Sequence, residues 1–218
     1  MAGGPIALAA AGAIAGALLG GPWIWLHYLC KPLTTLLILS LAARGAPVHS
    51  ARYRVAVVVG MVFSLAGDVF LMLPQDLFVA GLVAFLLAHL CFFVAFFPGA
   101  HWRARVVALV AYGAIGAANM ALLLPMIPQP LHGPVLAYVL VLVIMAGLAA
   151  ARAWSLRRDV ALARPAAFAA WGGALFVLSD SLLAWNRFAG GIPLSALLVL
   201  ASYFAALWCI ARSVAIRR

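Results

Sequence analysis

The stretch VAVVVGMVFSLAGDVFLML, residues 55–73, decides the fold class of this chain. It holds one ionisable side chain, Asp68, in a run close to the roughly 20 apolar residues that cross the hydrocarbon core of a bilayer as a helix. Pro74 follows directly and marks its end, because proline cannot continue a helix. The stretch therefore predicts a transmembrane helix whose lone carboxyl group needs a partner or a function.

The composition of the whole chain has the same character. Hydrophobic residues make up 68% of the 218 residues and charged residues 8%, whereas soluble domains average about 45–50% and about 25%. A soluble chain this apolar could not cover its own surface with polar groups. The composition therefore excludes a soluble protein and predicts one integral membrane domain that covers residues 1–218.

Hydropathy and the positions of Pro and Gly divide the chain into a bundle of eight transmembrane helices, an all-α fold. Their expected ranges are 5–26, 30–43, 54–73, 76–97, 104–124, 134–151, 165–186 and 192–213.

Two local patterns add detail to these helices. In the first helix Gly12, Gly16 and Gly20 recur at a spacing of four, which predicts a packing surface for a neighbouring helix. The second helix is expected to open at Lys31-Pro32, because proline fits the first helical position.

The basic residues predict the orientation. With a cytoplasmic N-terminus, 12 of the 14 basic residues fall on the cytoplasmic side, and only Lys31 and Arg187 fall on the other. The twelve are Arg44, Arg52, Arg54, Arg103, Arg105, Arg152, Arg157, Arg158, Arg164, Arg212, Arg217 and Arg218. Both termini are therefore expected in the cytoplasm. The net charge of +10 indicates attraction to anionic membrane lipid rather than to nucleic acid.

Heavy use of Ala and Arg, with a single Lys, is typical of a GC-rich bacterial genome. We therefore expect the protein in a bacterial inner (cytoplasmic) membrane. The oligomeric state is left open by the sequence.

Two of the four acidic residues are expected at membrane depth. Asp68 and Asp180 lie in the third and seventh predicted helices, whereas Asp76 and Asp159 fall in loops. At 1.5 Å per residue both intramembrane carboxyls sit about 7–9 Å below the outer edge. The two helices run in the same direction, and the segments AGDVFL, residues 66–71, and LSDSLL, residues 178–183, are alike. This likeness is consistent with a duplicated four-helix unit.

A pair of carboxyls at one level suits acid–base chemistry. Burial favours the neutral form of a carboxylic acid, and two neighbouring carboxyls do not readily ionise together. One proton donor and one ionised partner result. Such a pair can hydrolyse a vinyl ether by protonating carbon, stabilising the oxocarbenium ion and directing water to it.

Three other interpretations of the pair are weighed against this one. The two acids could lock helices together through Ser or Arg contacts. They could bind protons alternately in a proton-coupled transporter or lipid carrier, which a duplicated unit would favour. A metal-dependent hydrolase is disfavoured, because only His89 falls well inside a helix and Cys30, Cys91 and Cys209 show no ligand spacing. The remaining histidines fall at loops or helix ends: His27, His49, His101 and His132.

Several polar side chains are expected near the two carboxyls. Ser64 lies one turn before Asp68, and Arg187 lies two turns after Asp180. Lys31 is expected at the outer mouth of the second helix with Thr34 and Thr35 one turn further in, where an anion such as a lipid phosphate would suit it. The alternative is that Lys31 only reaches to the membrane surface.

Two further helices carry polar groups among aromatic ones. An i, i+3/i+4 stripe in the fourth helix is more typical of helix packing than of a ligand groove, and its His89 is either a proton carrier or a packing residue. The hydroxyl of Tyr203 in the last helix needs a buried partner. The stripe consists of Phe78, Gly81, Phe85, His89 and Phe92.

At these residues the chain resembles the YhhN-like membrane proteins, a family that includes the mammalian lysoplasmalogenases. The resemblance rests on KPLTT at 31–35, SLAGDVFL at 64–71, the stripe of the fourth helix with Gly81-Leu82, Ser179-Asp180 through Asn186-Arg187-Phe188, and Tyr203 with Ala206. It implies eight helices and hydrolysis of the vinyl-ether bond of lysoplasmalogens, a lysophospholipid class, to a fatty aldehyde and glycerophospho-choline or -ethanolamine, with no metal or other cofactor.

The resemblance also implies roles for individual residues. Asp68 and Asp180 correspond to the two acidic residues of the family and are expected to be catalytic. The substrate-binding residues are expected to be Lys31, Thr35, Ser64, His89, Ser179, Asn186, Arg187 and Tyr203. Leu207 stands where the family often has Gln, and Phe92 stands where it has Tyr. Both differences remove a hydrogen-bonding group and bear on the choice of substrate.

Overall fold

The computed structural model describes residues 3–45 and 50–214, and within these ranges the chain forms eight α-helices and three short 3-10 turns. The α-helices are α1 (Gly3–Leu19), α2 (Ile24–Arg44), α3 (Ala51–Met72), α4 (Phe78–Phe96), α5 (Trp102–Leu123), α6 (His132–Leu156), α7 (Ala163–Phe188) and α8 (Ser195–Val214). The 3-10 turns are η1 (Gly21–Trp23), η2 (Leu124–Met126) and η3 (Gln129–Leu131). The predicted all-α fold of eight helices is confirmed.

Seven of the described helices, some lengthened by a flanking turn, are long and apolar enough to span a bilayer, and α1 is a shorter apolar helix of 17 residues. Large apolar side chains cover the outside of the bundle; Trp102, Val110 and Trp171 are each about two-thirds exposed. A surface of this kind is solvated by lipid. The protein is therefore an integral membrane protein.

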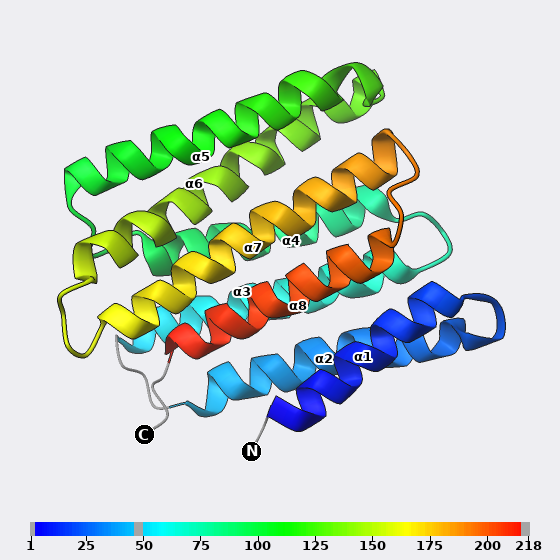
Figure 1. Ribbon diagram of the computed structural model, residues 1–218, viewed down its shortest axis with the longest axis horizontal. Helices are drawn as coiled ribbons and strands as arrows, with labels where there is room; N and C mark the ends of the chain where they lie inside the picture. Colours follow the sequence, from blue (N-terminus) through cyan, green and yellow to red (C-terminus); the bar gives the residue numbers. More distant parts are fainter. Residues whose placement is uncertain (1–2, 46–49, 215–218) are drawn as a thin grey trace.

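The helices lie side by side along one direction, and consecutive helices form antiparallel hairpins (Figure 1). The pairs are α1–α2, α3–α4, α5–α6 and α7–α8; α6 also packs on α4 and α7, and α8 packs on α1, α2 and α3. Of these helices, α3, α4, α7 and α8 contribute most of the residues that line the candidate site.

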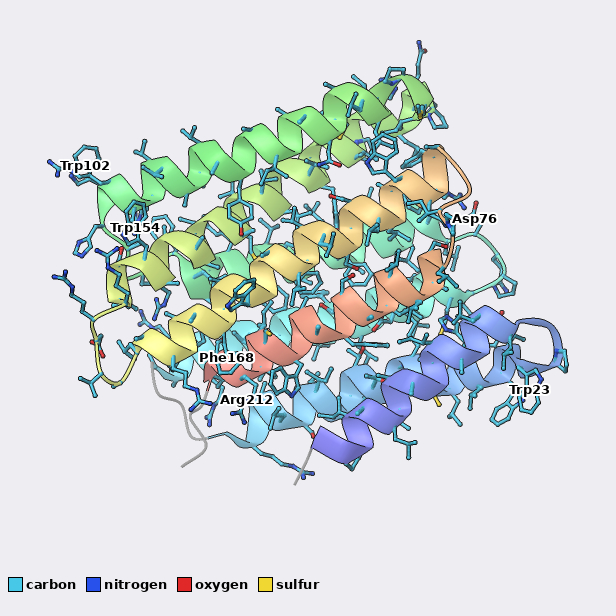
Figure 2. All side chains as sticks on the ribbon, viewed as in Figure 1. Trp23, Asp76, Trp102, Trp154, Phe168 and Arg212 are labelled. Carbon is cyan, nitrogen blue, oxygen red and sulfur yellow. The ribbon has the colours of Figure 1, made fainter. Side chains whose placement is uncertain are left out.

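The arginines gather at one end of the bundle. Arg217 and Arg218 of the predicted cytoplasmic group lie outside the described residues, and the other ten lie in or beside the helix termini at the left end of Figure 1. Figure 2 labels Arg212 at this end and Asp76 and Trp23 at the opposite end. The separation of charge agrees with the predicted topology, and the placement of this end in the cytoplasm stays a prediction.

The predicted boundary between the first two helices is wrong. The chain breaks at Gly20-Gly21-Pro22 rather than at Lys31-Pro32, so α1 ends at Leu19 and Pro32 lies inside α2. Gly20 and Gly21 have φ values of 59° and 47°, a left-handed conformation that glycine adopts without steric cost. As a consequence, Lys31 is the eighth residue of α2 and is buried inside the bundle. The other boundaries lie within a few residues of the prediction; α6 extends furthest beyond it, to Leu156.

The glycine stripe of the first helix packs as predicted at two of its three positions. A Cβ atom on Gly16 would lie 2.4 Å from the backbone nitrogen of His27, and one on Gly12 would lie 2.8 Å from Cys30 Sγ. Gly20 lies in the turn with open space around it. Because lipid supplies no hydrophobic drive between helices, this close approach of backbones is what pairs α1 with α2.

Gly16→Ala is therefore expected to destabilise the protein by about 1–3 kcal/mol, because the added methyl group overlaps the backbone of α2. Gly113 in α5 has nothing within 4 Å of its Cβ position. Gly113→Ala is the matched control, and it should leave stability unchanged or raise it by up to about 1 kcal/mol. Thermal unfolding of both variants in detergent measures the difference; equal shifts would contradict the packing argument.

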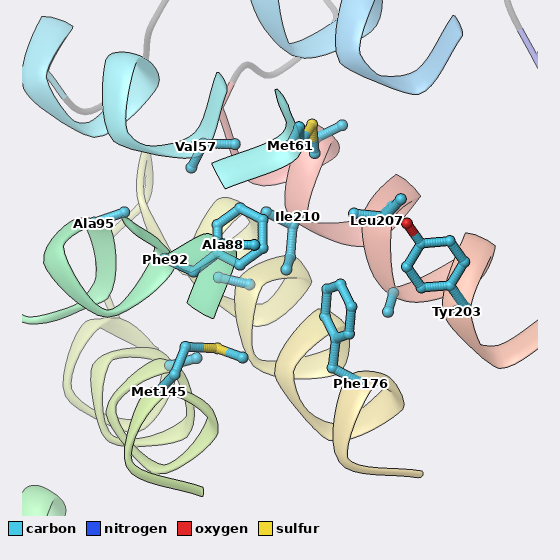
Figure 3. Packing of buried hydrophobic residues seen from close by; sticks show 14 of the residues in the cluster. Val57, Met61, Ala88, Phe92, Ala95, Met145, Phe176, Tyr203, Leu207 and Ile210 are labelled. Carbon is cyan, nitrogen blue, oxygen red and sulfur yellow. The ribbon is translucent and has the colours of Figure 1, made fainter. Parts of the chain in front are cut away.

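The core holds the site-bearing helices in register. Figure 3 shows Phe92, Met145, Phe176 and Ile210 packed together from α4, α6, α7 and α8. The rings of Phe92 and Phe176 lie 6.0 Å apart. Phe92 and Leu207, the two positions at which the resemblance is expected to break, are both fully buried in this cluster, so each fills the core with apolar volume.

Candidate active site

Asp68 is buried at the meeting point of α2, α3 and α8. Its Oδ2 accepts hydrogen bonds from Thr35 Oγ1 at 2.6 Å and from the Tyr203 hydroxyl at 2.8 Å. Lys31 Nζ lies 3.5 Å from Oδ1, and the Asp68 side chain is 1% exposed. The two hydroxyl donors and the ammonium offset part of the cost of burying this carboxyl group.

Lys31 is therefore placed differently from the sequence expectation. It lies in the interior of α2 rather than at a helix N-terminus, and its ammonium donates to the Asp68 backbone carbonyl at 3.4 Å as well as pairing with the carboxylate. The alternative in which Lys31 reaches out to the membrane surface is wrong, because the residue is buried.

Asp180 has a second, separate set of donors from α6 and α4. The Tyr138 hydroxyl donates to Asp180 Oδ2 at 2.6 Å. His89 Nε2 lies 3.3 Å from the same oxygen and 3.0 Å from the Tyr138 hydroxyl. His89 Nδ1 is buried without a hydrogen-bond partner among the described residues. This arrangement fits a proton on Nε2, which faces both oxygens.

The two carboxyl environments follow one plan. Asp68 on α3 receives donors from α2 and α8, and Asp180 on α7 receives donors from α6 and α4. Counting four helices onward from α3 and α2 gives α7 and α6. Counting four onward from α8, and starting again at α1 after the last helix, gives α4. This equivalence supports the duplicated four-helix unit. The Phe176 ring joins the sets, 5.8 Å from the Tyr203 ring and 5.0 Å from the His89 ring.

Both carboxyl groups line one cavity of about 250 Å³. Asp180 is the more accessible of the two, with 13% of its side chain exposed. Among the predicted site residues the structure brings six into this lining: Lys31, Asp68, Ser179, Asp180, Asn186 and Tyr203. The central expectation from the sequence, two intramembrane carboxyls at one site, agrees with this geometry.

The other four predicted residues lie outside the lining. Thr35 and His89 stand behind the carboxylates and donate to them. The Ser64 hydroxyl donates to the Gly60 carbonyl one turn earlier in α3 rather than to Asp68. Arg187 pairs with Asp76 at 2.6 Å, with both side chains largely exposed.

Sequence reasoning missed two residues of the site. Tyr138 donates to Asp180, and a tyrosine hydroxyl inside an apolar helix is a signal of the same kind as that of Tyr203. His27 lines the cavity from the first turn of α2, where its Nδ1 donates to the Ala13 carbonyl at 3.0 Å. The misplaced start of α2 hid this residue.

Within residues 3–45 and 50–214 no group of three His, Cys, Asp or Glu side chains is placed to hold a metal ion. Asp159 caps a loop by accepting from the backbone N–H groups of Ala161 and Leu162. The predicted loop positions of Asp76 and Asp159 are confirmed.

Comparison with known proteins shows what this chain is similar to. The chain is 32% identical to the lysoplasmalogenase TMEM86B of Sus scrofa, over 88% of this chain and 76% of the relative. It is 32% identical to the human lysoplasmalogenase TMEM86A, over 88% and 78%. It is 33% identical to a lysoplasmalogenase of Mycobacterium bovis, over 83% and 68%. No solved structure matches the chain. The pattern of the YhhN family matches residues 26–214, a range that holds both carboxyl sites, and the chain belongs to that family.

Proposed function

We propose that the protein hydrolyses the vinyl-ether bond of lysoplasmalogens to a fatty aldehyde and a glycerophospho-choline or -ethanolamine. One observation carries the proposal: Asp68 and Asp180 line the same intramembrane cavity with different partners. The names of the relatives point the same way, since each is a lysoplasmalogenase.

The reaction needs one acid, one stabilising anion and water. A proton passes to the alkene carbon that is not bonded to the ether oxygen, and the C=C electron pair forms the new C–H bond. The resulting oxocarbenium ion takes up water at the carbon bonded to oxygen, with loss of a proton. The hemiacetal then collapses to the aldehyde and the free glycerol hydroxyl. Acid–base catalysis supplies every step.

We assign one catalytic role to each carboxyl on the basis of its contacts. Asp180, which the Tyr138 hydroxyl and the His89 ring contact, is the proton donor; the same two groups stabilise its carboxylate once the proton has left. It then accepts the proton of the attacking water. Asp68, ionised beside Lys31, supplies negative charge facing the oxocarbenium ion. Glycosidases use a similar pair, in which one carboxylic acid donates a proton and a second carboxylate stabilises an oxocarbenium-like transition state.

The polar residues of the lining are proposed to hold the head group. Lys31 retains one N–H group for a phosphate oxygen beyond the two that face Asp68, and the Asn186 amide offers further donors on the same cavity. Ser179 lines the cavity as well, although its hydroxyl already donates to the Val199 carbonyl at 3.1 Å. Arg187 would act from the outer end of α7, where it already pairs with Asp76. Thr35, His89 and Tyr203 serve the substrate indirectly, by orienting the two carboxyls.

The test is aldehyde release from lysoplasmenyl-ethanolamine by the detergent-purified protein. Wild type should release aldehyde at the same rate with and without chelator, because the two carboxyls supply the chemistry. Asp68→Asn and Asp180→Asn should not. A folded wild type that releases no aldehyde would refute the proposal.

Tyr138→Phe should lower kcat by about 10–100-fold, because the Asp180 carboxylate loses a charge-assisted hydrogen bond while the ring stays in place. Tyr112→Phe is the matched control: Tyr112 lies in α5, away from this cavity, and its variant should keep wild-type kcat. Steady-state kinetics on both variants checks the role of Tyr138; unchanged kcat in Tyr138→Phe would contradict it.

A proton-coupled lipid carrier is the second candidate, favoured by the equivalence of the two carboxyl environments under a four-helix shift. It predicts uptake of protons into liposomes when lysolipid is added, and no aldehyde. The hydrolase proposal predicts aldehyde without proton transport.

A further inference from the structure

A second cavity, of about 80 Å³, lies between α4, α5, α6 and α7 and meets the first at Asp180. Leu71, Phe85, Asp180 and Leu183 line both. We call the second cavity the apolar crevice. It is defined by residues that line it and do not line the first cavity: Ile115, Gly116, Met120, Val139, Val143 and Ala184. The proposed proton donor therefore stands where a polar cavity and an apolar one join.

The polar groups on the crevice wall are mostly engaged already. The Tyr138 hydroxyl donates to Asp180. Asn119 accepts from Trp185 Nε1 at 3.1 Å and donates to the Ile115 carbonyl at 3.1 Å. A ligand in the crevice thus meets hydrocarbon over most of its length, which favours an alkyl chain.

The crevice runs along the helices rather than across them. On α7 its lining extends from Val177 to Phe188, a rise of about 16 Å at 1.5 Å per residue. Asp180 lies within this span, so a chain in the crevice has its polar end within reach of the carboxyl.

From this junction we propose that the apolar crevice binds the 1-alkenyl chain of the substrate, partly within its 80 Å³ and partly along its open side at Ile115. The head group occupies the polar cavity, and the vinyl ether lies at Asp180. The inference rests on the proposed function and adds the chain site to it. Phe85 and His89, two residues of the predicted stripe in the fourth helix, differ in their relation to this chain site. Phe85 lies on the crevice wall, but His89 is fully buried behind Asp180 and lines neither cavity.

Ala184→Leu tests the inference by filling the crevice. Each methylene that the crevice can no longer bury costs about fourfold in affinity. We expect kcat/KM to fall at least about tenfold for long-chain lysoplasmenyl-ethanolamine and to change less than about threefold for a short-chain analogue. Ala167→Leu makes the same substitution on the exposed face of α7 and should behave as wild type with both.

Ile115→Phe is a second variant, at the partly exposed rim of the crevice, for use if Ala184→Leu does not fold. It should show the same selective loss with long chains. Equal losses for long and short chains, or wild-type kinetics with both in a folded crevice variant, would overturn the chain site.

A binding measurement separates this inference from the proposed function. Saturated 1-alkyl lysophosphatidylethanolamine has no C=C bond to protonate, so its binding does not depend on hydrolysis. Its stabilisation of the protein against heating should grow with chain length in wild type and in Ala167→Leu, but not in Ala184→Leu. If stabilisation depends on chain length in this way but wild type releases no aldehyde, the hydrolase proposal is refuted and the chain site is retained. If stabilisation of wild type does not depend on chain length, the chain site is refuted.

Discussion

Asp180→Asn lowers aldehyde release by about 10²–10⁴-fold, because the amide cannot donate the proton that opens the vinyl ether. The substitution keeps the shape of the side chain, and Tyr138 and His89 remain beside it. The effect should therefore appear in kcat, with KM close to that of wild type. Steady-state rates of aldehyde release measure it.

Asp159→Asn is the control for this substitution. Asp159 is exposed and caps a loop at the opposite end of the bundle, so its variant should retain wild-type activity. Asp180→Asn should also unfold near the wild-type temperature. Retained activity in a folded Asp180→Asn protein would show that another group donates the proton.

Lys31→Met destabilises the protein by about 3–5 kcal/mol, because it leaves the buried Asp68 carboxylate without its cation. The double variant Lys31→Met/Asp68→Asn removes both charges. We expect it to recover most of the lost stability and to remain inactive, since the anion facing the oxocarbenium ion is gone. Unfolding in detergent, together with the aldehyde assay, measures both effects.

The exposed ion pair offers a matched control for this effect. Arg187→Met breaks the pair with Asp76, in which the side chains are 43% and 63% exposed. Exposed pairs contribute about 0–1 kcal/mol, so this variant should unfold close to wild type. A loss as large as that of Lys31→Met, or a double variant no more stable than Lys31→Met alone, would contradict the buried-pair account.

Hydropathy was enough to predict eight helices, since apolar runs of span length have few other stable forms in lipid. Hydropathy was not enough to place the break between α1 and α2. Lys31-Pro32 has the pattern of a helix start, yet Pro32 lies inside α2, where the Thr34 hydroxyl donates to the Cys30 carbonyl at 2.7 Å. Because membrane helices tolerate proline in their interior, Pro32 does not by itself mark a helix start.

The cost of a charge in lipid identified Asp68 and Asp180 from sequence, because any carboxyl at that depth requires partners. The identity of those partners depends on which helices become neighbours. Tyr138 and His89 reach Asp180 from helices that lie 42 and 91 residues before it in sequence. Local patterns carry no information on such pairing. Arg187 illustrates the same limit, because its partner Asp76 comes from the loop before α4.

The most direct test of the account is the reaction of wild-type protein with lysoplasmenyl-ethanolamine in D₂O, with the aldehyde trapped at once by reduction. Protonation at carbon places one deuterium on the carbon next to the aldehyde group, which mass spectrometry of the trapped product detects. Unlabelled aldehyde incubated with the protein in D₂O corrects for exchange. We predict one deuterium at this carbon in every product molecule; aldehyde without it, or no aldehyde at all, would contradict carboxyl-driven hydrolysis of the vinyl ether.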